Sequence, residues 1–200
     1  MRVVVVGATG IIGSALVEAL GGEHEVIRVG SRSGDVRADI SSPESIRELF
    51  RAVGQVDAVV SCAGNARFRP LAELEDDDFE FSLANKLMGQ VNLVRLGMEH
   101  VRDGGSFTLT SGVLSQIPMP GSAAISLVNA GVEAFARAAA LEAPRGIRVN
   151  TVSPPWVSET LQKMGQDPSG GLPARVVAKA YLSSLHDEIN GSTLDARRFE

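Results

Sequence analysis

The sequence predicts one α/β domain in which helices cover both faces of a parallel β-sheet, a doubly wound arrangement. Short runs of β-branched residues alternate with longer segments of helical periodicity along the whole chain, which is typical of repeated strand–helix–strand units. No repeat, low-complexity tract or linker divides the 200 residues, so residues 1–200 are expected to form a single domain. An apolar content of 44% is enough to fill a sizeable core and excludes a disordered chain.

Strands are predicted where β-branched and other apolar residues run together between turn residues. They cover 1–6, 25–29, a short segment near 36–40, 57–61, 106–110, 147–152 and 192–195. The first of them is apolar almost throughout, as expected of a parallel strand that is buried on both faces.

Helices are predicted between these strands. They cover about 13–20, a segment from 42–43 onward, 76 to about 101, 122–142 and a segment from 173 onward. Gly21 and Gly22 end the first helix, and Ser42 and Pro43 begin the second as its N-cap and first-turn residue. The helix over 123–141 is apolar on nearly all of its faces, so a second subunit is expected to cover what the sheet leaves exposed.

Composition narrows the classes of partner. A net charge of -5 provides no basic surplus, so neither nucleic acid nor an anionic membrane is expected as a partner. The only cysteine, Cys62, cannot form an internal disulfide or a multi-thiolate metal site, which favours a reducing, cytoplasmic location. The apolar run over 3–6 is too short for a signal-peptide core or a bilayer span.

A glycine-rich turn follows the first strand. Gly7, Gly10 and Gly13 are spaced three apart between a buried strand and a helix, where the backbone can approach a pyrophosphate and the helix N–H groups can bind it. Thr9 and Ile12 lie in the same turn and are predicted to bind the dinucleotide as well. The alternative is that these glycines only allow a tight turn from strand to helix.

The end of the second predicted strand favours NADP(H) over NAD(H). A site for NAD usually has an acidic residue there, whereas this chain has Ser31, Arg32 and Ser33. Arg32 can stack on adenine and pair with a 2′-phosphate, with both serine hydroxyls as further donors. The alternative is that Arg32 is a solvated loop residue.

Further motifs follow the glycine turn in a fixed order. They are Asp39-Ile40, Ser61-Cys62-Ala63-Gly64, Asn85 in the first long helix, Ser111 directly after a strand, and Arg-Val-Asn-Thr-Val-Ser-Pro over 148–154. In this order the chain resembles the short-chain dehydrogenase/reductase superfamily over nearly its whole length. The resemblance implies a Rossmann-like fold, NAD(P)H binding, hydride transfer to or from a carbonyl or alcohol carbon, and a homodimer or homotetramer built through the two long helices.

The resemblance also implies where the rest of the cofactor lies. It gives Asp39 the place of the family's adenine-ring aspartate, with Ile40 beside it. The segment Cys62, Ala63 and Gly64 is expected to line the adenosine, and Pro154 and Val157 are expected to contribute after the last strand-end motif. Without a base beside it, Cys62 is expected to act as a small buried filler rather than as a nucleophile.

The chain departs from the family pattern in its catalytic pair. Counted from Ser111, the family's Tyr-x-x-x-Lys motif should fall at Ala124 and Val128, and neither side chain can donate a proton. The only tyrosine, Tyr181, is expected to pack against the sheet or a partner subunit. The chain also lacks the usual helix after the second strand and has a short segment before Pro173, so it resembles a divergent short member.

Three residues remain as catalytic candidates. Ser111 can donate a hydrogen bond to a carbonyl oxygen, unless it only caps a strand end. Asn85 and Lys86 lie on the helix whose midpoint faces the active site in the family, and a desolvated Lys86 could donate a proton or hold the ribose. The alternative is that Lys86 faces solvent or a partner subunit, because successive helical residues differ in direction by about 100°.

Other chemistry-bearing residues have plainer interpretations. The acidic run over 73–78 is expected to begin a helix, where carboxylates suit the helix dipole, rather than to bind a metal. Trp156, Leu161 and Met164 are candidates to line a substrate pocket.

Two functions fit these features. The first is an NADP(H)-dependent oxidoreductase that acts on a small carbonyl or alcohol with an atypical proton source. The second is a catalytically inactive NADP(H)-binding sensor or assembly subunit. A third hypothesis, an α/β domain that binds no nucleotide, stays open until binding is measured.

Overall fold

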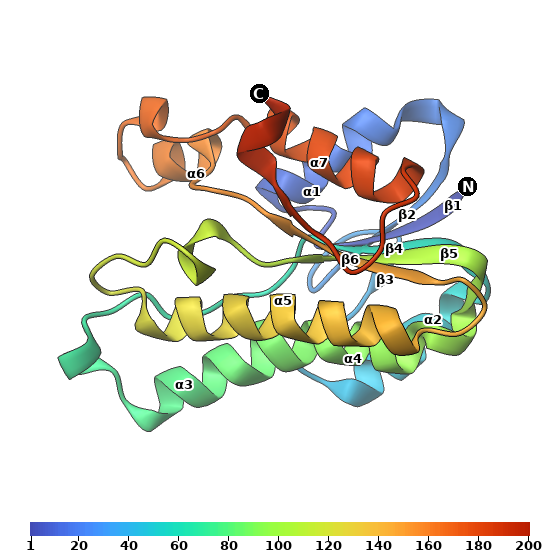
Figure 1. The fold of residues 1–200 in the computed structure, drawn as a ribbon, viewed down its shortest axis with the longest axis horizontal. Coiled ribbons are helices and arrows are strands. Elements are labelled where there is room, and N and C mark those ends of the chain that lie inside the picture. Colours follow the sequence, from blue (N-terminus) through green and yellow to red (C-terminus); the bar gives the residue numbers. More distant parts are fainter.

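The computed structural model describes residues 1–200 and contains a seven-stranded sheet in the order β3-β2-β1-β4-β5-β6-β7 (Figure 1). Every neighbouring pair is parallel. The strands are β1 (Arg2–Val6), β2 (Glu25–Gly30), β3 (Val36–Arg37), β4 (Val56–Ser61), β5 (Val101–Thr110), β6 (Arg148–Ser153) and β7 (Thr193–Asp195). The chain progresses outward from β1 to β3 and then from β4 to β7, so the strand order reverses between β1 and β4. This confirms the predicted doubly wound sheet.

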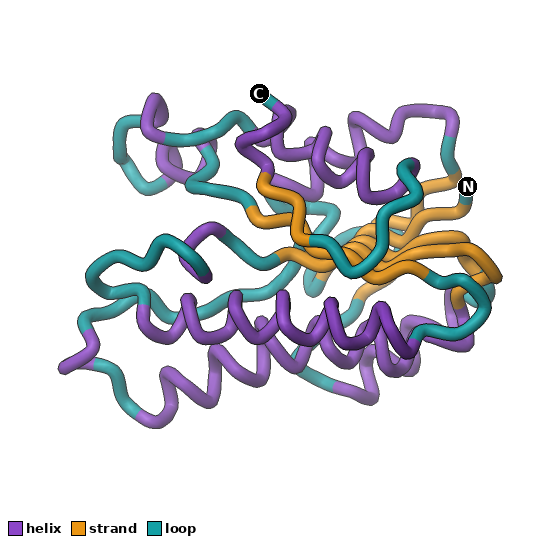
Figure 2. Tube along the Cα trace, in the orientation of Figure 1, coloured by secondary structure: helices purple, strands orange, loops and turns teal.

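Helices form one layer on each face of the sheet (Figures 1 and 2). One layer contains α1 (Ile11–Leu20), α6 (Ser158–Lys163) and α7 (Ala174–His186), and the other contains α2 (Pro43–Val53), α3 (Asp76–Ser82), α4 (Gly89–Gly97) and α5 (Ala123–Glu142). Side chains of β1 alternate between the two cores, because successive residues of a strand point to opposite faces. Val3 and Val5 belong to the core under α1 and α7, and Val4 and Val6 to the core under the other layer.

The structure refines several predicted bounds. The helix predicted over 76–101 consists of α3, a π-helical segment (Leu83–Met88) and α4, followed by a short 3₁₀ turn. The strand expected near 36–40 ends at Arg37, because the Asp39 carboxylate accepts the Ser41 N–H and turns the chain. Helix α6 was not predicted, since its six residues are too few for a helical period to show.

Ser42 caps α2 as expected, by accepting the Ser45 N–H. By length and composition alone, α5 could cross a membrane, with a hydropathy of 1.3 over its most apolar window. Long core helices of soluble proteins meet the same criterion, so this is weak evidence for a membrane span.

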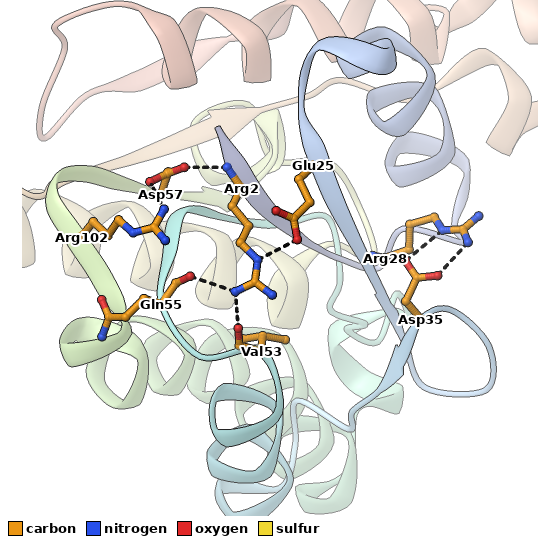
Figure 3. Close-up of polar contacts among 8 residues, drawn as sticks. All are labelled: Arg2, Glu25, Arg28, Asp35, Val53, Gln55, Asp57 and Arg102. Atoms are coloured by element: carbon orange, nitrogen blue, oxygen red, sulfur yellow. Dashed lines mark hydrogen bonds and ion pairs between the residues drawn. The ribbon is translucent and has the colours of Figure 1, made fainter.

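Ion pairs join the amino ends of the central strands (Figure 3). The Asp57 carboxylate accepts the Arg2 backbone N–H at 2.6 Å and pairs with Arg102 at 2.8 Å. The Arg2 guanidinium in turn pairs with Glu25 at 2.8 Å and donates to the carbonyls of Val53 and Gln55. These contacts connect β1, β2, β4 and β5 at the sheet edge opposite to the one where parallel α/β proteins bind ligands.

Candidate functional site

Two adjoining cavities lie at the carboxyl ends of the strands. One, of about 310 Å³, is lined by residues that include Gly7, Thr9, Gly10, Gly30, Ser31, Asp39, Ile40, Asn65 and Asn85, and we call it the glycine-side cavity. The other, of about 260 Å³, is lined by residues that include Ile12, Lys86, Ser111, Val113, Leu114, Ile125, Asn129, Pro154, Trp156 and Val157, and we call it the serine-side cavity. Both share Cys62, Ala63 and Gly64 after β4. Together they form a groove across the point where the strand order reverses.

The turn after β1 depends on glycine. Gly7 has a φ of +85°, and a Cβ there would lie 2.8 Å from the Cys62 carbonyl carbon. A Cβ at Gly13 would lie 2.1 Å from the Gly7 carbonyl oxygen, so Gly13 lets α1 pack against the turn. Gly13 therefore lies behind the turn and does not line either cavity, unlike Gly7 and Gly10.

Helix α1 presents free backbone donors beside the glycine-side cavity. Its first intrahelical hydrogen bond runs from the Ser14 N–H to the Gly10 carbonyl, so the N–H groups of residues 11–13 precede the helical ladder. Such donors, together with the positive end of the helix dipole, bind phosphate in proteins. The residues present fit a pyrophosphate.

The loop between β2 and β3 differs in part from expectation. Ser31 lines the glycine-side cavity, whereas Arg32 and Ser33 are exposed and line neither cavity. Arg28 and Asp35 close the base of this loop through an ion pair at 2.7 Å (Figure 3). Arg32 and Ser33 thus lie at an exposed loop tip, where they can contact only what binds over it, and their role in cofactor binding stays a prediction.

Ser111 is held firmly at the end of β5. Its N–H donates to the Val152 carbonyl at 2.9 Å, its hydroxyl makes a longer hydrogen bond to the same carbonyl at 3.4 Å, and the residue is only 3% exposed. The buried Gln90 amide accepts the Thr110 N–H at 2.7 Å and donates to the Thr110 carbonyl at 2.8 Å. Gln90 thereby fixes the strand end that carries Ser111. The sequence analysis missed this positioning residue, because its partner is backbone on another element.

Lys86 faces the serine-side cavity and not solvent. It is 8% exposed, and no charged group contributes to its environment. Burial alone lowers the pKa of Lys86 from 10.5 to about 8. The lysine lies in the π-helical segment, and its stem packs on Gly64, where a Cβ would lie 3.1 Å from the Lys86 Cγ. The solvent-facing alternative for Lys86 is thus wrong.

Asn85, the neighbour of Lys86, takes part in the other cavity. Its Oδ1 accepts the Asn65 N–H at 2.7 Å, which holds the loop after β4. Lys86 and Ser111 therefore line the serine-side cavity, whereas Asn85 lines the glycine-side cavity. Since π-helical turns are frequent at functional sites, this local widening is consistent with a role for Lys86.

Helix α5 contributes Ile125 and Asn129 to the serine-side cavity, four residues apart. The sequence analysis expected Ala124 and Val128 in this place, and that expectation is off by one residue. Ala124 and Val128 are fully buried and line neither cavity. The Asn129 Oδ1 is buried without a hydrogen-bond partner, which destabilises the folded protein. A ligand that donates a hydrogen bond to this oxygen would remove that cost. Asn129 is one of the few polar residues in the largely apolar first half of α5, which was the available sequence signal for it.

Tyr181 packs under the sheet, as predicted. It is fully buried in the core between the sheet and α7, and its hydroxyl contacts the Thr110 hydroxyl. Burial raises the pKa of the Cys62 thiol to about 12, so this thiol stays protonated and is a poor nucleophile. Tyr181 does not line the serine-side cavity.

The remaining candidates are resolved by their contacts. Glu75 and Asp78 form a capping box at the start of α3, which matches the expected helix start. Of the three residues predicted to line a substrate pocket, Trp156 lines the serine-side cavity. Leu161 is buried in the fold and Met164 is 54% exposed, and neither lines the cavity.

Comparisons with known proteins agree with this geometry. Residues 6–188 match the family model described as enoyl-(acyl carrier protein) reductase. A Listeria innocua protein of known structure shares 42% identity and superposes with a TM-score of 0.93, over 98% of both chains. A small-chain dehydrogenase solved in complex with NADPH shares 27% identity with a TM-score of 0.86, over 98% of this chain and 95% of the other.

Among curated proteins, the hydroxynaphthalene reductase-like protein Arp2 of Metarhizium brunneum is 32% identical over 136 residues, which is 65% of this chain and 51% of the relative. The chain thus spans about half the length of the first curated relatives it matches. An uncharacterized oxidoreductase of Methylorubrum extorquens is 28% identical, over 86% of this chain and 81% of the relative. With the family model covering most of the chain and these structural neighbours, the protein belongs to the short-chain dehydrogenase/reductase superfamily.

Proposed function

We propose that this protein is an NADP(H)-dependent oxidoreductase that interconverts a small carbonyl compound and its alcohol. One observation carries the proposal: Ser111 and Lys86 line the same cavity, and that cavity adjoins the glycine-side cavity through the shared residues Cys62, Ala63 and Gly64. A groove that fits a dinucleotide therefore ends beside two side chains that can bind and protonate an oxygen.

The glycine-side cavity supports binding of the adenosine and pyrophosphate part of the cofactor. Gly7, Gly10 and the free N–H groups at the start of α1 would hold the pyrophosphate, with Thr9 beside them. Asp39 and Ile40 line the far end and would contact the adenine. The cofactor would continue past Ala63 and Gly64 into the serine-side cavity, which is lined by Ile12, Pro154 and Val157.

The preference for NADP(H) rests on the loop between β2 and β3. Asp35 is the acidic residue of this loop, and its ion pair with Arg28 keeps the pKa of Asp35 low and its charge compensated. Ser31 faces the cavity, and Arg32 follows it on the exposed loop without an ion-pair partner. A 2′-phosphate over this loop would therefore meet a hydroxyl and a guanidinium rather than a carboxylate.

The chain's own groups can carry the rest of the reaction. When bound, a reduced nicotinamide would supply the hydride for the carbonyl carbon, and the C=O π pair would move to the oxygen. Ser111 donates a hydrogen bond to that oxygen and orients the carbonyl. Lys86 transfers a proton to the same oxygen, which completes the alcohol. With a pKa of about 8, Lys86 is mostly protonated at pH 7 and releases its proton readily.

Asn129 supports the same assignment. It reaches the cavity from α5, four residues after Ile125, which is the spacing of the family's tyrosine and lysine. We therefore place Ile125 and Asn129, and not Ala124 and Val128, at the positions of that pair. The unpartnered Asn129 Oδ1 could accept a hydrogen bond from the nicotinamide ribose, a contact that the missing lysine would otherwise make as a donor.

The test is NADPH oxidation with a panel of small ketones and aldehydes. Ser111→Ala is expected to lower kcat/KM by about 10²- to 10³-fold while NADPH still raises Tm, because it removes only a transition-state hydrogen bond. NADPH binding without turnover of any panel member by the wild type would support the alternative, a nucleotide-binding sensor. Absence of NADPH binding would contradict both functions.

A further inference from the structure

The serine-side cavity combines a few polar groups with a larger set of apolar ones. Ser111, Lys86, Asn129, Thr110 and Thr160 are its polar lining residues, and Val113, Leu114, Ile125 and Pro155 are among the apolar ones. No carboxylate or arginine lines this cavity. A ligand that fills it therefore combines a hydrogen-bonding oxygen with an uncharged, largely apolar body.

Trp156 forms part of the apolar wall and is the only tryptophan of the chain. Phe68, from the loop after β4, packs edge-on against its ring, with centroids 6.1 Å apart and planes at 68°. Phe68 does not line the cavity. Trp156 thus lies between Phe68 and the cavity, and Phe68 fixes the orientation of the indole without contacting what the cavity holds.

The loop that carries Phe68 is itself anchored. The Arg69 N–H donates to the Gly121 carbonyl at 2.9 Å, and a Cβ at Gly121 would lie 3.0 Å from the Phe68 ring. Both Arg67 and Arg69 form ion pairs with the buried Asp78 carboxylate, at 3.3 and 2.9 Å. The Trp156 side chain is therefore held in place before a ligand binds, so a ring that stacks on it binds without the entropic cost of ordering that side chain.

We propose that the substrate is a flat, uncharged aryl ketone whose ring stacks on Trp156 while its oxygen reaches Ser111, with Phe68 as a positioning residue. This substrate class rests on the oxidoreductase proposed above. The cavity volume of about 260 Å³ lies below the roughly 300–1,000 Å³ of pockets for drug-sized ligands, and the nicotinamide would take part of it, so it favours a small body of one or two rings.

The experiment compares 1-tetralone with 1-decalone, two bicyclic ketones with the same carbon skeleton of which only the first is aromatic. Because Trp156 is the only tryptophan, its fluorescence reports binding directly, without nucleotide or turnover. We expect 1-tetralone to quench it saturably, with a Kd about tenfold lower than that of 1-decalone. Equal affinity for the two ketones, or no saturable quenching, would overturn the proposal.

Variants separate stacking from a general effect on the fold. Trp156→Leu is expected to raise the KM for 1-tetralone about tenfold with little change in kcat.

The Phe68 variants test its positioning role. Phe68→Ala should weaken the binding of 1-tetralone measured by Trp156 fluorescence, and Phe68→Tyr should restore it. Leu71→Ala is the matched control, since Leu71 lies in the same loop, is 70% exposed and lines no cavity. If Phe68→Ala binds 1-tetralone as the wild type does, the positioning role is wrong.

The two proposals fail separately. Saturable quenching by 1-tetralone without any NADPH oxidation would contradict the oxidoreductase and keep the aromatic subsite. Turnover of aliphatic ketones in preference to 1-tetralone would keep the oxidoreductase and contradict the aromatic subsite.

Discussion

At the scale of single residues, Lys86 lies in an environment that is unfavourable for its charged form. It is buried beside Ser111 without a carboxylate partner, and burial lowers its pKa to about 8. Burial of an unpaired lysine does not stabilise the fold, but it brings the pKa of the ammonium near the working pH, which is what a proton donor needs. Perturbed ionisable groups of this kind gather at active sites, which is why Lys86 is the residue to test first.

The burial of Lys86 predicts a stability change with a definite pH dependence. The folded pKa of about 8 lies below the unfolded value of 10.5, so the unfolded chain binds this proton more tightly. Burial of the charged Lys86 therefore destabilises the folded state by its full amount below pH 8, and this destabilisation disappears as the pH rises toward 10.5. Lys86→Met should therefore raise the free energy of unfolding at pH 7, by up to about 3 kcal/mol at about 1.4 kcal/mol per pH unit. Urea unfolding at several pH values measures it, and a gain that grows with pH would contradict it.

The same group predicts the pH profile of catalysis. The kcat/KM for ketone reduction should be constant below pH 8 and fall above it, as Lys86 loses its proton. Lys86→Met should lower the rate by about 10²- to 10⁴-fold and remove that inflection. Lys86→Arg keeps the charge but cannot release a proton, so it should resemble Lys86→Met. An unchanged profile in Lys86→Met would assign the proton to another donor.

At the scale of elements, the turn after β1 and the loop after β2 set how a dinucleotide is held. The turn depends on the absence of side chains, since a Cβ at Gly13 would lie 2.1 Å from the Gly7 carbonyl oxygen. The loop depends on the ion pair of Arg28 with Asp35, which leaves Arg32 at the exposed tip. We expect the first element to determine whether a nucleotide binds and the second to determine which nucleotide is preferred.

Gly13→Ala tests the turn. The added methyl group must displace the backbone, which typically costs about 1–3 kcal/mol, and it should also weaken stabilisation by NADPH. Gly22→Ala provides the matched control, because nothing lies within 4 Å of a Cβ there. Thermal unfolding with and without NADPH measures both. A Gly13→Ala protein as stable and as responsive as Gly22→Ala would contradict the close approach of α1 to the turn.

Arg32→Ala tests the choice of cofactor. NADPH is expected to raise Tm more than NADH does in the wild type, and the difference should vanish in Arg32→Ala because the 2′-phosphate loses its guanidinium partner. Arg51→Ala, an exposed arginine on α2, should leave the difference intact. Equal effects of the two nucleotides on the wild type would refute the role of Arg32.

At the scale of the whole molecule, one surface remains apolar. A groove between α4 and α5 is lined mostly by apolar residues, among them Val94, Met98, Phe135, Ala138 and Ala139, with Arg95 and Glu142 as its charged members, and Leu141 near the end of α5 is 89% exposed. We propose that a second copy of the chain covers this surface, as the apolar character of α5 predicts.

Sedimentation tests the dimer. The wild type should sediment at twice the chain mass of 21.0 kDa. Ala138→Arg, which places a charge in the groove, should sediment as a monomer, whereas Ala19→Arg on the exposed side of α1 should not change the mass. A monomeric wild type would contradict the proposal.

The sequence by itself determined the sheet, the glycine turn and the order of the motifs. Periodicity and turn residues act over a few neighbouring positions, so Gly7, Ser42 and Ser111 could be assigned without coordinates. The superfamily followed from the same local patterns, since their order along the chain is what the resemblance rests on.

Only the tertiary structure decided which side chains meet. Lys86 reaches the cavity because a π-helical turn changes its direction, and Asn129 faces it where the sequence count had placed Val128. The direction of a helical side chain changes by about 100° with each residue, so an error of one position exchanges a core residue for a site residue. Local pattern fixes the element, but packing against the sheet fixes its rotation, and rotation determines the chemistry of the site.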